Sequence, residues 1–110
     1  AIFAFNDLAA VNVYRAARQR GISLPDQLSI IGFDDVYPAA SMYPALTTIR
    51  QPFDLIARKC IDLILEAREG KVEQNYTILP TRLVERESCA PPASGRGGSP
   101  PPHSAAEPAE

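Results

Sequence analysis

The chain of 110 residues contains no tryptophan, one histidine, one methionine and two cysteines. Its histidine, His103, lies in a proline-rich segment, which removes most reaction schemes that need a histidine as general base. Cys60 and Cys89 follow neither a metal-ligand spacing nor a disulfide framework, so we expect free thiols in a reducing compartment, the cytoplasm. No serine or cysteine stands in a nucleophile turn. These absences argue against an enzyme and against a bound metal or cofactor.

The chain also lacks a membrane signal and an excess of basic residues. No stretch approaches about 18 uninterrupted apolar residues, so we expect no membrane partner. No signal-peptide pattern opens the chain, but this carries little weight because the chain does not begin with methionine. Residues 1–90 carry ten Lys or Arg and eleven Asp or Glu, whereas a nucleic-acid surface needs a basic stripe. The chain begins with alanine, and its single methionine is Met42. We therefore expect a piece of a longer protein.

Composition divides the chain into one domain and a tail. Residues 91–110 hold six of the eleven prolines and no large apolar side chain. Such a segment cannot bury enough surface to offset its chain entropy, which predicts a disordered tail. Residues 1–90 have the length and apolar content of a single domain.

The first third of the domain has the pattern of a β-α-β unit. Residues 1–5 and 28–33 are short apolar runs, which are typical of strands buried inside a parallel sheet. Between them we predict a helix over residues 8–20, with Asp7 as its N-cap and Gly21 at its end. The helical period places four residues against the sheet: Ala9, Val13, Ala16 and Ala17. A right-handed crossover then makes the two strands parallel.

The rest of the domain continues the α/β pattern. We predict a long loop over residues 36–45, a strand over 46–49 and a helix over 52–69 that Pro52 opens and Gly70 closes. That helix has an apolar stripe that we expect to be buried: Phe53, Ile56, Ala57, Cys60, Ile64 and Ala67. Two more strands are expected over 76–79 and 82–86, the last at a sheet edge.

The chemistry of the chain is concentrated where its strands end. Asp34 and Asp35 directly follow the second apolar run, and Asn6 follows the first. Ligands of parallel sheets bind beyond the carboxyl ends of the strands, and an acidic group there suits a polyhydroxylated or amine-bearing molecule. The alternative is structural, because Asp and Asn at such positions also form turns and cap helices. We expect Asp35 to cap local backbone N–H groups. Without a G-x-G-x-x-G turn, a dinucleotide site is not expected.

Four stretches, in this order and spacing, carry a family resemblance. They are Phe5-Asn6-Asp7 before a helix, the run from Leu24-Pro25-Asp26 to Asp34-Asp35, the run from Pro44 to Phe53, and the run from Leu79-Pro80 to Ser88. Together they resemble the C-terminal part of the effector-binding domain of LacI/GalR-type transcriptional regulators. The resemblance covers essentially residues 1–90.

This resemblance implies a fold and a function. The fold is a partial Rossmann-like parallel sheet, the C-terminal lobe of a periplasmic-binding-protein-like type I fold. The whole protein would be a dimeric repressor with a sugar or similar small effector between two lobes. Operator DNA would be held only through an N-terminal helix-turn-helix, and nothing in this chain resembles one.

The resemblance also implies residue roles. Four positions match effector contacts: Asn6, Asp34, Gln51 and Phe53. A cap for Asn6 and a plain core position for Phe53 are the alternatives. Four further positions match the dimer surface: Leu8, Val11, Met42 and Tyr43.

A sugar-binding receptor of an ABC importer shares the fold and is the second candidate. The run from Leu46 to Phe53 and the ending from Arg82 to Ser88 favour the repressor. A signal peptide in place of a helix-turn-helix in the full reading frame would reverse that preference.

Overall fold

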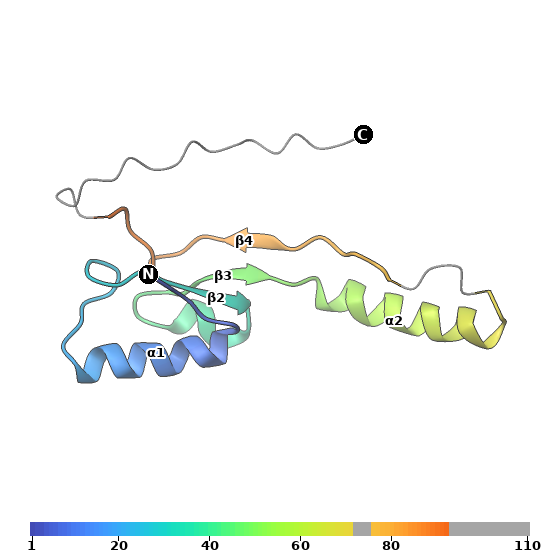
Figure 1. Ribbon diagram of the computed structural model, residues 1–110, viewed down its shortest axis with the longest axis horizontal. Helices are drawn as coiled ribbons and strands as arrows, with labels where there is room; N and C mark the ends of the chain where they lie inside the picture. The colour runs from blue at the N-terminus through green and yellow to red at the C-terminus, as the bar shows by residue number, and fades with distance from the viewer. Residues whose placement is uncertain (72–75, 93–110) are drawn as a thin grey trace.

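The computed structural model describes residues 1–71 and 76–92, so the predicted tail lies almost entirely outside the described residues. The described strands form one four-stranded sheet in the order β1-β2-β3-β4 (Figure 1). Their bounds are Ile2–Phe3 for β1, Ile30–Asp34 for β2, Thr47–Arg50 for β3 and Arg82–Val84 for β4. The first three strands are parallel and β4 runs antiparallel to β3. The predicted α/β class with a mostly parallel sheet is confirmed.

The register brings the ends of the parallel strands to one edge of the sheet. Ile2 pairs with Ile30 in the ladder between β1 and β2. Between β2 and β3, Ile31 pairs with Thr47 and Asp34 pairs with Arg50. The segments that follow β1, β2 and β3 therefore all leave the sheet at the same rim.

The first helix, α1 (Asp7–Gln19), begins and faces the sheet differently from the prediction. Its N-cap is Asn6 rather than Asp7. Its buried residues are Asp7, Ala10 and Ala17; of the four predicted sheet-facing residues Ala17 is buried, while Ala9 and Val13 are partly buried and pack against the core. The reason is that the Asp7 side chain points into the interior, so the buried face of α1 is the face that carries Asp7, Ala10 and Ala17. Gly21 has a φ of 66° just beyond the helix, as expected for its end.

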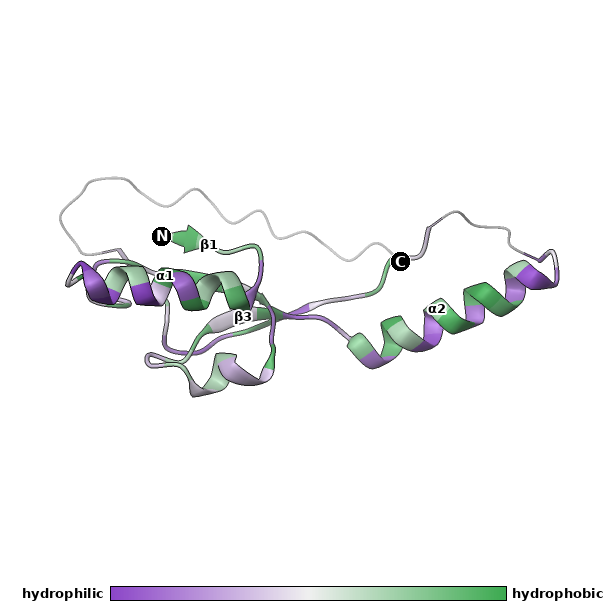
Figure 2. Ribbon diagram, turned by 90° about the horizontal axis from the view of Figure 1, so that it is seen from below, coloured by the Kyte–Doolittle hydropathy of each residue, from purple (hydrophilic) through white to green (hydrophobic). Residues whose placement is uncertain are grey.

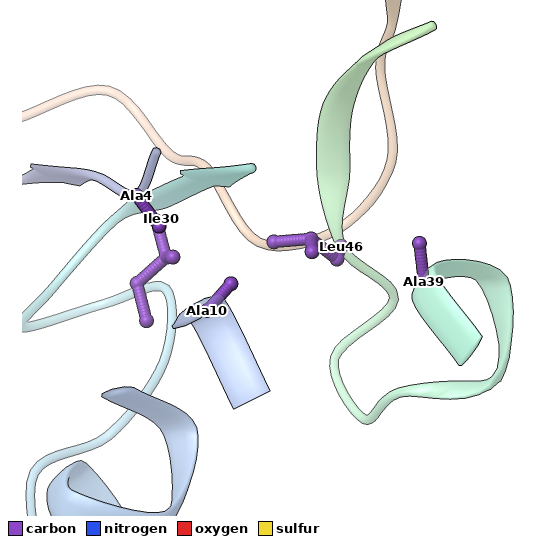
Figure 3. Close-up of a cluster of buried hydrophobic side chains, with 5 residues drawn as sticks. All are labelled: Ala4, Ala10, Ile30, Ala39 and Leu46. Carbon is purple, nitrogen blue, oxygen red and sulfur yellow. The ribbon is translucent and has the colours of Figure 1, made fainter. Parts of the chain in front are cut away.

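A small hydrophobic core lies between the sheet, α1 and the short 3-10 helix η1 (Tyr37–Ser41), which forms within the predicted loop. Figure 3 shows its buried side chains: Ala4, Ala10, Ile30, Ala39 and Leu46. Three of the five are alanines, which let the helical segments approach the backbone of the sheet closely. The core thereby fixes α1 and η1 beside β2 and β3.

The second helix, α2 (Phe53–Arg68), has no buried residue, so the prediction of a buried apolar stripe is wrong. Figure 1 shows α2 beyond the end of the sheet, far from α1. Apolar residues recur along α2 between hydrophilic ones (Figure 2), and Ile61, Ile64 and Leu65 are all at least half exposed. The apolar pattern is real, but no described element covers it.

The strand predicted over residues 76–79 does not form. These residues run beside α2, where Tyr76, Thr77 and Leu79 line a shallow hollow together with Ile56 and Leu63. This position lies beyond the end of the sheet, where no described strand offers them a hydrogen-bonding partner.

The closing segment stays attached to the sheet beyond β4. The ladder with β3 ends at Val84, two residues earlier than predicted, and β4 lies at the predicted edge. Further on, the Arg86 amide donates to Thr47 Oγ1 at 2.9 Å and the Glu87 amide donates to the Ala45 carbonyl at 2.9 Å. Ser88 is fully buried. These contacts hold residues 86–88 across the amino ends of the strands.

The strand β1 forms the other edge of the sheet and is not buried, contrary to the prediction. It pairs with β2 alone, and Phe3 and Phe5 are 65% and 80% exposed. An exposed apolar edge is a template for pairing with another chain.

We therefore expect the 110-residue chain to be marginally stable and to associate through β1. Sedimentation at increasing concentration should show a rising average mass, and Phe3→Lys should reduce it because a charge at an edge opposes pairing. Phe53→Lys, on a side chain far from β1, is the matched control. A sharp, concentration-independent unfolding of a monomer would contradict this expectation.

Candidate functional site

Three of the predicted effector residues stand at the rim formed by the carboxyl ends of the parallel strands. Asp34 ends β2, Gln51 directly follows β3, and Asn6 follows β1. Their placement follows from the parallel ladders rather than from closeness in sequence. This is the edge at which parallel α/β sheets bind ligands.

Asp34 and Gln51 are in direct contact. The Gln51 Nε2 amide donates to Asp34 Oδ1 at 2.6 Å, and both side chains are partly buried. This contact uses one carboxylate oxygen and leaves the other as an acceptor. A carboxylate already oriented by a neighbour offers a pre-positioned, charge-assisted acceptor for a ligand hydroxyl.

Phe53 lies at the same place and is not a core residue. It is 51% exposed and opens α2 directly after Gln51 and Pro52. Asp34, Gln51 and Phe53 together line an open hollow of about 440 Å³. The lining of the hollow therefore combines polar side chains with an aromatic ring, the combination that a sugar ring uses.

Asn6 lies at the rim but is not among the residues that line this hollow. Its Oδ1 accepts a hydrogen bond from the Ala9 amide at 2.8 Å, which caps the first turn of α1. The capping alternative is therefore what the structure shows for that oxygen. Its amide nitrogen keeps two donors.

Asp35 does not cap local backbone N–H groups as predicted, because two arginines bind its carboxylate. Arg86 Nη2 donates to Asp35 Oδ1 at 2.6 Å, and Arg50 Nε donates to Asp35 Oδ2. Burial by itself raises the pKa of the Asp35 carboxyl, but the bonds from Arg86 and then Arg50 outweigh it and hold the pKa below 3.8. The side chain is 4% exposed.

This lowered pKa predicts an acid-dependent loss of stability. A carboxyl whose folded pKa lies below its unfolded pKa contributes stability that is complete above the unfolded value and is lost as the pH falls through the folded one. The free energy of unfolding should therefore decline below about pH 4, and Asp35→Asn should flatten that decline. Urea unfolding across this range measures it. Asp26→Asn, on an exposed turn, is the matched control.

Asp7 is a buried anchor, a role that differs from the helix N-cap predicted for it. Asp7 is 1% exposed; its Oδ1 accepts from Thr48 Oγ1 at 2.6 Å and its Oδ2 from the Val36 amide at 2.9 Å. The available signal was Gly32, since a glycine inside an apolar strand often marks the close approach of another group. A Cβ built on Gly32 would lie 2.2 Å from Asp7 Oδ1.

A second surface gathers three of the four predicted dimer residues. Val11 of α1, Met42 and Tyr43 line one open groove with Tyr14 and Leu24. The Tyr14 hydroxyl donates to the Pro44 carbonyl at 2.9 Å, which ties α1 to the segment after η1. The fourth residue, Leu8, is 63% exposed on α1 and does not line the groove.

The described residues offer no support for a metal site or a membrane span. Residues 1–71 and 76–92 contain no group of three His, Cys, Asp or Glu side chains that could hold a metal ion. None of the helices in this part of the chain combines the length and the hydropathy that crossing a bilayer requires.

Residues 1–89 match the family described as periplasmic binding protein-like domain. The lactose operon repressor of Rhizobium radiobacter is 34% identical over 94 residues, which cover 86% of this chain and 83% of that protein. The HTH-type transcriptional regulator DegA of Bacillus subtilis is 44% identical over 92 residues, 83% of this chain and 27% of that regulator. The chain belongs to the periplasmic binding protein-like domain family, in the group of LacI/GalR-type transcriptional regulators.

Solved structures agree with this assignment. A periplasmic binding protein/LacI transcriptional regulator from Alkaliphilus metalliredigens, complexed with D-xylulofuranose, is 40% identical with a TM-score of 0.73. The match covers 82% of this chain and 34% of that one. The lac repressor dimer bound to operator and the anti-inducer ONPF is 30% identical with a TM-score of 0.74, over 79% of this chain and 30% of that one. This chain thus spans about a third or less of these regulators.

Proposed function

We propose that this chain is the effector-sensing and dimerising portion of a LacI/GalR-type transcriptional repressor whose effector is a sugar or a similar small molecule. The observation that carries the proposal is the Asp34–Gln51 contact at the strand ends, with Phe53 beside it in one hollow. The structural neighbour from Alkaliphilus metalliredigens is complexed with a pentulose, which points to the same class of ligand.

The proposed site assigns a different interaction to each residue. The Asp34 carboxylate accepts hydrogen bonds from two ligand hydroxyls, or from one hydroxyl while Gln51 keeps the other oxygen. The Gln51 amide adds a polar contact, and the Phe53 ring packs against the apolar face of the sugar. Asn6 offers its amide donors from the neighbouring strand end. These four residues form one wall of the proposed interlobe cleft, and other residues of the whole protein would form the second wall.

We further propose that the groove lined by Val11, Met42 and Tyr43 belongs to the contact between two copies in a homodimer, with Leu8 at its border. The support is that residues from two separate segments form one surface, with Tyr43 94% exposed. Operator DNA would be bound through a separate helix-turn-helix in the cytoplasm. The matched relatives are regulators, so an importer receptor is not favoured and neither is an enzyme.

The test uses the protein expressed from its complete reading frame, with ribose and D-xylulose as probes. Titration calorimetry of the wild type should show saturable binding of at least one pentose, and Asp34→Ala should weaken it at least tenfold because a charge-assisted pair contributes roughly 1.5–3 kcal/mol. Asp62→Ala, which removes an exposed carboxylate of α2 that does not line the hollow, is the matched control. A signal peptide at the start of the frame would point to the importer receptor instead.

The 110-residue chain alone should bind neither pentose measurably, since only one wall of the proposed cleft is present in it. Calorimetry with the same two sugars checks this expectation. Tight, saturable binding by the chain alone would contradict the two-walled site.

A further inference from the structure

The turn that presents Asp34 has an unusual backbone. Asp34 has a φ of 106° and Asp35 a φ of 56°, so two consecutive non-glycine residues have positive φ. Such residues are uncommon, and a φ near 106° lies outside the left-handed region that aspartate tolerates best. Conformations of this kind cost roughly 1–3 kcal/mol each and persist only where the surroundings determine them. The contacts that hold this turn must supply that energy.

One anchor lies directly after Asp34. The Asp35 carboxylate is bound by Arg50, the residue before Gln51, so the Asp35–Arg50 pair lies beside the Asp34–Gln51 contact. Arg86 binds the same carboxylate from the closing segment. Arg86 Nη1 also donates to the Leu46 carbonyl at 2.7 Å, and its side chain is only 16% exposed. Arg86 therefore ties the turn to a part of the chain remote in sequence.

A second anchor lies one residue further. The Val36 amide donates to Asp7 Oδ2, and Asp7 is itself held by Thr48 of β3. The residues on the C-terminal side of Asp34 are therefore held by two buried carboxylates: Asp35, which accepts from two arginines, and Asp7, which accepts from the Thr48 hydroxyl and the Val36 amide. With β2 fixing the N-terminal side, the turn has little freedom to change its φ angles.

We propose that Arg86 is a positioning residue of the effector site, which acts through Asp35 to hold Asp34 in its positive-φ conformation facing Gln51. The inference rests on the proposed function for its consequence in binding, but its geometric part stands without a ligand. If it is right, the segment after β4 contributes to effector affinity, although none of its residues was predicted to contact the effector. Arg86 itself does not line the hollow.

The geometric part is tested on the full chain by NMR. The three-bond coupling between the amide and α protons of Asp34 reports φ, and it should be small in the wild type. In Arg86→Met it should rise towards the value of extended backbone, and the Gln51 side-chain amide resonances should shift. Arg82→Met, an exposed arginine of β4, is the matched control and should leave both signals unchanged. If Arg86→Met does not fold, Arg86→Lys and Asp35→Asn serve in its place.

The functional part is tested on the protein from its complete reading frame with ribose and D-xylulose. Arg86→Met should raise the dissociation constant at least tenfold, Arg86→Lys should recover part of the loss, and Arg82→Met should match the wild type. An unchanged Asp34 coupling in folded Arg86→Met, or wild-type affinity in that variant, would overturn the inference. If the wild type binds no pentose, the proposed sugar effector fails, and the NMR comparison still decides the positioning.

Discussion

Gly32→Ala is expected to remove about 3 kcal/mol or more from the free energy of unfolding, enough to abolish cooperative unfolding in a marginal chain. The added Cβ would lie 2.2 Å from Asp7 Oδ1 and 2.9 Å from Leu46 Cδ2. Both neighbours are buried, and Asp7 cannot retreat without breaking its hydrogen bonds to Thr48 and Val36. Urea unfolding followed by circular dichroism measures the loss.

Gly70→Ala separates this packing effect from a backbone effect. Gly70 has a φ of 71° and nothing within 4 Å of a built Cβ, so alanine there should cost only about 1 kcal/mol of left-handed strain. A Gly32→Ala variant as stable as Gly70→Ala would show that Asp7 does not lie against β2.

Ser88→Ala is expected to destabilise the chain by about 2–4 kcal/mol, the second largest effect. The Ser88 hydroxyl accepts from the Thr47 amide at 2.8 Å and donates to the Ile30 carbonyl at 2.6 Å, with no exposure to solvent. Alanine leaves the Thr47 amide buried without this partner, which costs roughly 1–3 kcal/mol, and leaves the Ile30 carbonyl with only the weaker Cys89 Sγ donor at 3.3 Å. Chemical denaturation midpoints of the two proteins give the difference.

Ser41→Ala is the matched control for Ser88→Ala. Ser41 ends η1 on the surface, and its replacement should change stability by less than about 0.5 kcal/mol. If Ser88→Ala lowers the free energy of unfolding by less than about 1 kcal/mol, Ser88 does not hold residues 86–88 against the amino ends of the strands.

Apart from η1 and the strand wrongly predicted over residues 76–79, the order of strands and helices could be predicted from the sequence because each apolar run is short and bounded by turn residues. The parallel pairing of β1 with β2 follows from the β-α-β pattern. The pairing of β2 with β3, which brings Asp34 and Gln51 into contact, does not follow from that pattern. For α2, the apolar face was predicted correctly, but the inference that this face is buried was wrong. The periodicity of a sequence shows that one face of a helix is apolar. Whether that face is buried depends on which other helices or strands pack against it.

The partners of charged side chains could not be predicted. The sequence pattern pairs Asp35 with local backbone groups, whereas its partners are Arg50 and Arg86, 15 and 51 residues away. Such pairings depend on register and on the path of the closing segment, neither of which a local pattern encodes. Asp7 shows the same limit, because a residue at a helix start looks like a cap whether it faces solvent or the interior.

The absence of any buried residue in α2 has a consequence for how the chain resists local opening. No described helix or strand packs on α2 to oppose its unwinding, whereas α1 is held by Ala10 and Ala17 against the sheet. Backbone amides of α2 should therefore take up deuterium far faster than those of α1 and β2. Among residues 1–71 and 76–92, a protease should cut first within residues 53–71, leaving the paired strands β1 to β3 with α1 as one resistant fragment.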